Sequence, residues 1–211
     1  MNKKILVIGD YNDAKWHPLK GVDERLGRIL KDYVVKCTED YASLTSDELK
    51  KYALLINYAD AWRTRGTRQT AGAILSYVAE GGSLLTLHSG IIMRSTPEME
   101  LLQGGRFTGH PEACDLTYAP TESKHPILDG VQAFTIFEEP YRVTMADFAE
   151  HEVLMTYSHD GQDWPAAWAL SYGMGKVVYL SMGHQAQSFD NEMFAKLIIN
   201  SVKWCGEASD V

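Results

Sequence analysis

The stretch SLLTLHSGI, Ser83 to Ile91, indicates the fold class most directly, because an apolar strand in it stops at a histidine, a serine and a glycine. A short run that is apolar throughout is typical of a strand buried on both faces of a sheet. We therefore expect Leu84 to Leu87 to lie in the centre of a sheet, with His88 at the tip of the strand. The segments around it decide what chemistry that histidine can serve.

The flanking segments alternate between strand patterns and helix patterns. KKILVIG, YVVKCT and ALLINYA are short strand-like runs, whereas GVDERLGRILKDY carries apolar residues at close to a 3.6-residue period. SDELKKY predicts a short helix opened by Ser46, and TRQTAGAILSYVAEG predicts a longer one closed by Gly81. Apolar strands that alternate with helices favour a parallel sheet covered on both faces. The sequence thus predicts an α/β fold with three αβα layers, of the flavodoxin-like kind, whose mainly parallel sheet contains Ile5 to Ile8, Leu54 to Ile56, Leu84 to Leu87 and Val177 to Leu180.

The pattern changes from residue 104 onward. The short β-type segments RFTGHP, DLTYAP, AFTIFEEPYRV and EVLMTYS are separated by Gly, Pro and Asp, without a convincing helix between them. We expect extra antiparallel strands here, followed by a hairpin around YGMG whose second strand returns to the core and ends at His184. NEMFAKLIINSVKWC predicts a final amphipathic helix opened by Asp190. With no repeats or linkers, the chain is predicted to form a single domain over residues 1–211.

Composition limits the partners and the compartment. The 211 residues carry a formal net charge of −8, which argues against nucleic acid or an anionic membrane as the main partner. Three cysteines without CxxC spacing predict neither a disulfide framework nor a zinc knuckle, and the apolar run at the N-terminus is too short for a signal peptide. Glycine-rich nucleotide-binding motifs are absent, so no nucleotide cofactor is expected. We predict a cytoplasmic protein with a small-molecule partner; a homo-oligomer is compatible with the sequence.

Polar candidates collect just past the predicted strand ends, where ligands bind in doubly wound sheets. They are His17, Asp60 with Trp62, His88 and, in LSMGHQ, His184. TLHSG resembles a nucleophile elbow with His88 at its centre, where a histidine can act as a base, an acid or a metal ligand. Since the two strands should run parallel, His88 and His184 are expected to converge. The alternative is two unrelated strand ends, each bonded to a nearby carbonyl.

Two further segments extend the candidate site. FTGHP holds His110 in a rigid turn between Gly109 and Pro111 that can aim its side chain. In FEEPYRV one of Glu138 and Glu139 can face a cleft, where it would orient an imidazole, transfer a proton or complete a metal set of histidines and a carboxylate. A solvated edge strand is the alternative interpretation of this acidic pair.

Tryptophan is frequent in the predicted loops and strand ends. Sugars stack their C–H faces on such rings while carboxylates and amides bind the hydroxyl groups, so we expect a small carbohydrate ligand. Core packing would explain any single tryptophan equally well. The residues concerned are Trp16, Trp62, Trp164 and Trp168.

Together these motifs resemble the trehalose-utilisation (ThuA-like) family, whose fold is that of the class I glutamine amidotransferases. The resemblance covers nearly the whole chain and comprises the N-terminal strand followed by HP, then LLTLHSG, GGRFTGHP, KHPILDGV, EEPY and YGMGKVVYLSMGHQ. It implies a role in the metabolism of trehalose, related disaccharides or their keto derivatives. In the EEPY pattern the glutamate of the family matches Glu139 rather than Glu138.

The resemblance also bears on the reaction. TLHSG stands where the amidotransferases have Gly-x-Cys-x-Gly, so His88 replaces the nucleophilic cysteine, while His184 matches the histidine of their triad. Without the thiolate, glutaminase activity is not expected. We expect acid/base or metal-assisted chemistry on a sugar, with a divalent metal ion left open; a non-catalytic sugar-binding or regulatory protein is the alternative. The expected catalytic residues are His88, His184, Glu139 and His110, and the expected ligand-binding residues are Ser89, Trp62, Tyr141 and His17.

Overall fold

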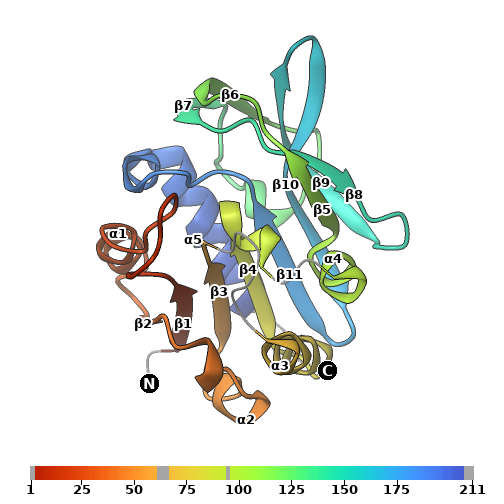
Figure 1. Cartoon of the computed structure of the whole chain (residues 1–211). Helices are drawn as coiled ribbons and strands as arrows, with labels where there is room; N and C mark the ends of the chain where they lie inside the picture. The colour runs from red at the N-terminus through yellow and green to blue at the C-terminus, as the bar shows by residue number, and fades with distance from the viewer. Residues whose placement is uncertain (1–2, 61–66, 94–95, 207–211) are drawn as a thin grey trace.

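A nine-stranded sheet runs through the centre of the molecule (Figure 1). The computed structural model describes residues 3–60, 67–93 and 96–206. The parallel strands of the sheet lie in the order β2 (Val34–Thr38), β1 (Lys4–Gly9), β3 (Leu54–Tyr58), β4 (Ser83–Leu87) and β11 (Gly175–Leu180). The α/β class with a mainly parallel sheet is thereby confirmed, and each predicted core segment lies in one of these strands.

The second half of the chain adds antiparallel strands to the same sheet, as predicted. They are β10 (Gln162–Tyr172), β9 (His151–His159), β6 (Cys114–Pro120) and β7 (Phe134–Glu138). β10 and β11 form the hairpin expected around YGMG, in which Tyr172 pairs with Gly175. A separate two-stranded sheet joins β5 (Gly105–Gly109) to β8 (Arg142–Met145). AFTIFEEPYRV is thus divided between two sheets, because Pro140 has no N–H group to donate to a ladder.

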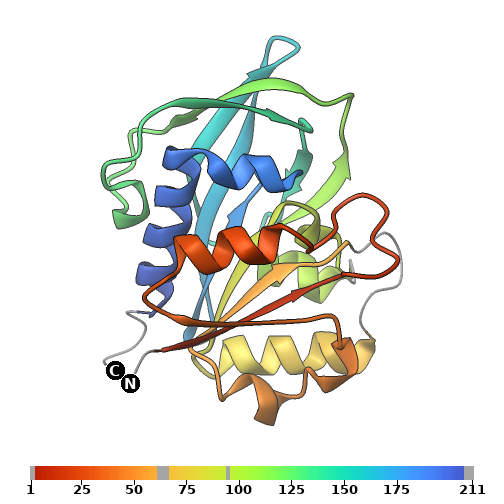
Figure 2. The same ribbon diagram turned by 90° about the vertical axis from the view of Figure 1, so that its left-hand side faces the viewer.

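Helices cover both faces of the parallel strands (Figure 2). α1 (Val22–Ile29) and α5 (Glu192–Gly206) pack on one face, and α2 (Ser46–Leu49), α3 (Arg68–Ala79) and α4 (Pro97–Gln103) pack on the other. Successive residues of β1 serve these two cores in turn, since side chains alternate along a strand. Short 3₁₀ helices, labelled η, follow several of these elements: η1 (Tyr41–Ser43), η2 (His88–Ile92), η3 (Pro126–Leu128) and η4 (Ala186–Asp190). Within the described residues, every helix is too short or too polar to cross a membrane.

Two helix starts differ from the predicted ones by one residue. α2 is capped by the hydroxyl group of Thr45, and Ser46 is already its first helical residue. α5 is capped by Asn191, whose side-chain oxygen accepts two N–H groups of the first turn. Asp190 instead forms an ion pair with Arg25 of α1 at 2.8 Å. In both cases neighbouring residues have similar capping ability, and tertiary contacts decide between them.

Gly175→Ala should destabilise the fold. An added Cβ would lie 2.2 Å from the carbonyl oxygens of Gly82 and Val78, so the hairpin would have to move away from the end of α3. Overpacking of this kind costs about 1 to 3 kcal/mol in the free energy of unfolding, measured by urea denaturation. Gly72→Ala is the matched control: its Cβ would meet nothing within 4 Å on α3 and should stabilise the protein by up to about 1 kcal/mol. Equal effects of the two changes would contradict the packing described.

Candidate functional site

His88 ends β4 in a strained turn. Its φ is 42°, in the left-handed region that residues other than glycine rarely adopt, and its side chain is buried. Its Nδ1 lies 2.6 Å from the carbonyl oxygen of Ser181 and donates to it, because a carbonyl oxygen can only accept. Burial lowers the pKa of His88 to about 3, so the ring is neutral at neutral pH. Its Nε2 then carries a lone pair that can accept a proton or bind a metal ion.

The turn after His88 packs closely on β3. Asn57 donates from Nδ2 to the carbonyl oxygen of Gly90 at 2.9 Å, and a Cβ on Gly90 would lie 2.4 Å from the Asn57 carbonyl oxygen. A glycine is therefore needed two residues after the histidine. Ser89, one of the expected ligand-binding residues, is buried within this turn, and its Oγ has no hydrogen-bond partner among the described residues.

His17 comes from the loop after β1 and is oriented by Asp60, which follows β3. Its Nδ1 donates to Asp60 Oδ1 at 2.9 Å, while its buried Nε2 has no hydrogen-bond partner among the described residues. Burial lowers the pKa of His17, but the nearby carboxylates of Asp60 and Glu139 raise it by more, so the net shift is upward. The sequence places Asp60 at a strand end without giving it a role. Its position directly after a buried strand was the available signal.

Glu138 lies beneath the site and organises it. Its buried carboxylate accepts the N–H group of Gly183 at 2.9 Å and the N–H group of His184 at 2.9 Å. Burial raises the pKa of Glu138 to about 7, against the lowering effect of hydrogen bonds from Ser188 and from these N–H groups. Glu138 thereby holds the turn after β11 from which the side chain of His184 extends. The sequence pattern favoured Glu139 for the site and did not indicate this role of its neighbour.

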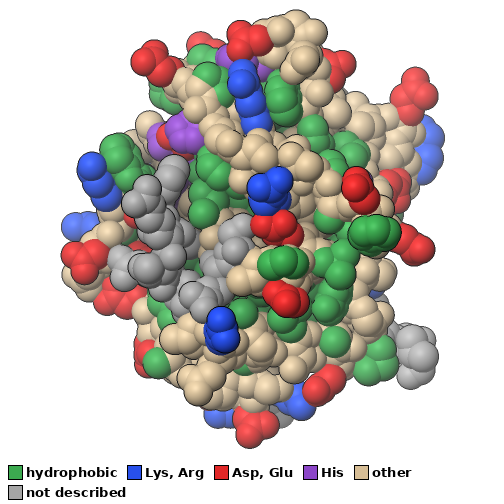
Figure 3. Space-filling view, turned by 45° about the vertical axis from the view of Figure 1, so that its right-hand side comes forward, with side chains coloured by type: hydrophobic (Ala, Val, Ile, Leu, Met, Phe, Trp, Pro, Cys, Tyr) green, Lys and Arg blue, Asp and Glu red, His purple; other side chains and the backbone are tan. Residues whose placement is uncertain are grey.

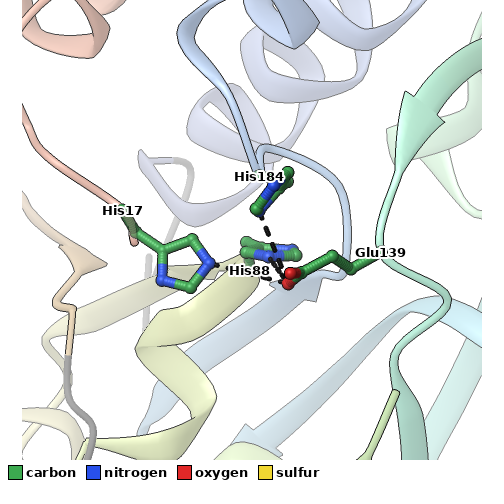
Figure 4. A group of neighbouring side chains, drawn as sticks. All are labelled: His17, His88, Glu139 and His184. Carbon is green, nitrogen blue, oxygen red and sulfur yellow. Dashed lines mark hydrogen bonds and ion pairs between the residues drawn. The ribbon is translucent and has the colours of Figure 1, made fainter. Parts of the chain in front are cut away.

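Glu139 is surrounded by ring nitrogens. Its Oε2 lies 3.3 Å from His88 Nε2, 3.4 Å from His184 Nδ1 and 3.7 Å from both His17 Nε2 and His110 Nε2. Burial alone would raise the pKa of Glu139, but the histidines lower it more strongly, and the carboxyl group is ionised. The pKa of His184 is lowered, chiefly by burial. Figure 4 shows the side chains reaching one point from separate loops.

The expected pair of histidines therefore meets in the structure. The ring centroids of His88 and His184 lie 5.5 Å apart, and the ring of His17 lies 4.8 Å from that of His88. His88 follows β4, His184 follows β11 and His17 follows β1. The carboxyl ends of these strands share one edge of the parallel sheet. Convergence is thus a consequence of topology, since parallel strands end on the same side.

A pocket of about 270 Å³ opens on this cluster, lined by Trp16, His17, His110 and Glu139. In Figure 3 purple histidine atoms reach the surface beside red acidic atoms on the left of the view. The side chain of His110 is 25% exposed, and its Nδ1 donates to the carbonyl oxygen of Pro111 at 2.8 Å. Its Nε2 is thereby directed at Glu139, and His110 is the histidine that a molecule in the pocket would meet first.

The expected aromatic residues have different places. Tyr141 stacks on His88 with ring centroids 4.0 Å apart, but it is only 1% exposed, so it supports the histidine ring from within the protein. Trp16 is 53% exposed and lines the pocket. Trp62 lies outside the described residues.

Two other tryptophans considered as sugar platforms lie elsewhere. Trp168 is fully buried, and its Nε1 donates to the carbonyl oxygen of Gln103 at 2.8 Å. Trp164 packs against the apolar core and beneath the guanidinium of Arg142. Both pack in hydrophobic clusters of the fold, and the described residues that line the pocket include Trp16 but neither of these two.

The cluster has the composition of a metal centre. One ligand atom from each of His17, His88, Glu139 and His184 lies within 4.8 Å of all the others. Zinc–nitrogen bonds of about 2.0 to 2.1 Å place neighbouring tetrahedral ligands roughly 3.3 to 3.4 Å apart. The distances of 3.3 and 3.4 Å from Glu139 match this, whereas the 3.7 Å to His17 Nε2 is wider. Imidazole nitrogens with one carboxylate suit a divalent transition-metal ion.

Comparisons with known proteins agree with the fold. A family model described as trehalose utilisation (ThuA) matches residues 5–205. A ThuA-like protein from Bacteroides uniformis is 20% identical, with a TM-score of 0.78, over 96% of this chain and 91% of the other. A ThuA-like protein from Parabacteroides merdae is 16% identical, with a TM-score of 0.82, over 98% of this chain and 91% of the other.

Other similarities are more distant. A cytoplasmic protein from Salmonella typhimurium is 14% identical, with a TM-score of 0.69, over 96% of this chain and 98% of the other. No curated protein sequence matches the chain. At these identities the solved structures share the fold, whereas the activity depends on the side chains of the site.

Glu138→Ala should destabilise the protein although it removes no residue of the cluster. The change leaves the N–H groups of Gly183 and His184 without their acceptor, and breaking such contacts costs about 2 to 4 kcal/mol in the free energy of unfolding. Urea denaturation measures the effect. Glu112→Ala, at an exposed position, is the control and should change stability by less than about 0.5 kcal/mol. A Glu138 variant as stable as this control would show that the carboxylate does not hold the turn.

Proposed function

The chain belongs to the trehalose-utilisation (ThuA) family, and on that premise we propose that it is an enzyme of carbohydrate utilisation whose catalytic centre is the histidine cluster around Glu139. The proposed substrate is trehalose, a related disaccharide or a keto-sugar derived from one, and the reaction takes place at a hydroxyl or carbonyl group. The proposal includes a cytoplasmic location and no nucleic-acid or membrane partner.

One observation carries the proposal. When Nδ1 of His88 donates to the Ser181 carbonyl oxygen, Nε2 has no proton, yet it faces the ionised Glu139 carboxylate at 3.3 Å. Two lone pairs at this distance repel unless a proton or a cation lies between them. The buried Nε2 of His17 and Nδ1 of His184 also have no hydrogen-bond partner among the described residues. Such an arrangement favours a cation held between the four groups.

We propose a divalent transition-metal ion as that cation. When bound, it would polarise a sugar hydroxyl or carbonyl oxygen as a Lewis acid. Asp60 and the Ser181 carbonyl group keep the Nδ1 protons on His17 and His88, so that both rings present Nε2 to the centre. His110 stands outside the ligand set and faces the pocket, where its Nε2 can take a proton from the reacting hydroxyl group and return it.

Glutamine hydrolysis is not part of the proposal. The amidotransferase reaction needs a thiolate at the elbow, and His88 occupies that position here. The three cysteines lie elsewhere: Cys37 is in β2, Cys114 begins β6 and Cys205 is in α5. Burial raises the pKa of Cys205 to about 12, which leaves its thiol unreactive.

A non-catalytic sugar-binding protein is the second candidate, and the exposed ring of Trp16 beside the pocket supports it. A binding protein would depend on Trp16 for sugar affinity and tolerate loss of the histidines. An enzyme would lose turnover with the histidines, and Trp16 would affect chiefly KM.

Zinc binding tests the proposed centre. Protein stripped with a chelator should bind one Zn²⁺ ion per chain in isothermal titration calorimetry. His88→Ala and His184→Ala each remove a ligand and should weaken binding by about 100-fold or more. His151→Ala, at the start of β9, is the matched control and should bind Zn²⁺ as the parent does. Parent affinity in both cluster variants would refute the metal centre and leave proton transfer by the histidines themselves.

Turnover of a verified sugar substrate separates the two candidate functions. His110→Ala should lower kcat by about 10²-fold while leaving Zn²⁺ affinity intact, because His110 acts on the substrate and not on the metal. Trp16→Ala should raise KM with a smaller effect on kcat, since it removes a stacking surface. If His110→Ala, His88→Ala and His184→Ala all retained the parent kcat, the binding-protein function would be favoured.

A further inference from the structure

A second pocket of about 330 Å³ adjoins the cluster. Trp16 lines both pockets. From the cluster, His184 lines the second pocket, whereas His17 and Glu139 line the first. Both pockets therefore open on the same group of side chains. Their volumes of about 270 and 330 Å³ lie just below and just above the lower limit of about 300 Å³ for small-molecule sites, which suits parts of one sugar-sized ligand.

The second pocket is basic in an acidic protein. The chain carries a formal net charge of −8, yet the described residues that line the pocket include Lys15 and Lys20 and no aspartate or glutamate. Gln185 and Gln187 add amide groups that can donate hydrogen bonds. A pocket lined by one sign of charge attracts ligands of the opposite sign.

Lys15 and Lys20 have no ion-pair partner within the part of the chain that the structure describes. Arg25, Lys50 and Lys51, by contrast, all form ion pairs. Lys15 Nζ lies 4.3 Å from the centroid of the Trp16 ring, so the aromatic surface and the charge are presented together. Lys15 and Lys20 thus lie beside an exposed tryptophan and the histidine cluster, a placement that solvation of the surface alone does not require.

We propose that the second pocket binds an anionic substituent, a phosphate or a carboxylate, of the sugar that the cluster acts on. The sugar ring would lie against Trp16, with its anionic group at Lys15 and Lys20 and its reacting group at the cluster. This inference rests on the proposed function for the reaction, but the anion pocket stands on its own lining. With such an anion pocket, the protein would bind an acidic sugar in preference to a neutral disaccharide.

Calorimetry with defined sugars tests the inference. Zinc-loaded and chelator-stripped protein are each titrated with trehalose 6-phosphate, glucuronic acid and neutral trehalose. At least one of the two acidic sugars should bind about tenfold or more tightly than trehalose, and the comparison between them identifies the anionic group. The double variant Lys15→Met/Lys20→Met keeps the aliphatic stems and should bring the ratio close to one. Lys31→Met/Lys124→Met, at exposed positions outside the pocket, is the matched control and should keep the parent ratio.

The outcomes distinguish this inference from the proposed function. A preference that depends on the two pocket lysines supports the inference, even if the stripped protein fails to bind Zn²⁺ and the metal centre is refuted. Equal affinity for acidic and neutral sugars overturns it, as does a preference that survives in the Lys15→Met/Lys20→Met variant, since the anion would then be held by the cluster. Unchanged midpoints of thermal unfolding verify that each variant is folded.

Discussion

The hydrogen bonds that the Glu138 carboxylate accepts from Gly183 and His184 join two distant parts of the sheet, and the site depends on them. β7 lies four strands beyond β11 in the sheet order, yet its last residue meets the turn that follows β11. The twist of the antiparallel strands makes this meeting geometrically accessible. A buried carboxylate is stable only where donors surround it, so the contact specifies one position for β7. Glu139, the next residue, is thereby placed among the histidines.

The resulting cluster is electrostatically unusual. His17 and His88 direct Nε2, and His184 directs Nδ1, toward one ionised carboxylate, and Asp60 adds a second negative charge behind His17. A protein interior opposes such a concentration of acceptors, because unpaired polar groups are costly there. A cation between them would convert this repulsion into binding energy, and the same groups would then favour a substrate oxygen that joins the centre.

The elbow at His88 shows how one backbone geometry can serve different chemistry. Its left-handed φ of 42° stores strain of about 1 to 3 kcal/mol, which the contact between Asn57 and Gly90 helps to offset. In an amidotransferase-like elbow this turn presents a nucleophile, whereas here it presents a neutral imidazole with Tyr141 stacked on it. On the function proposed above, the imidazole would serve a different class of reaction from the one that a nucleophilic thiol serves at such a turn.

The sequence by itself determined the features that local patterns control. Apolar runs and helical periodicity were enough to predict the parallel strands, and the rule that parallel strands end at one edge was enough to predict that His88 and His184 would meet. Only the tertiary structure decided that Asp60 orients His17, that Glu138 holds the turn of His184, and that Trp16 rather than Trp164 lines the pocket. The physical reason is that these contacts join residues 43 to 46 positions apart or depend on sheet curvature and loop paths, which no periodicity in the chain encodes.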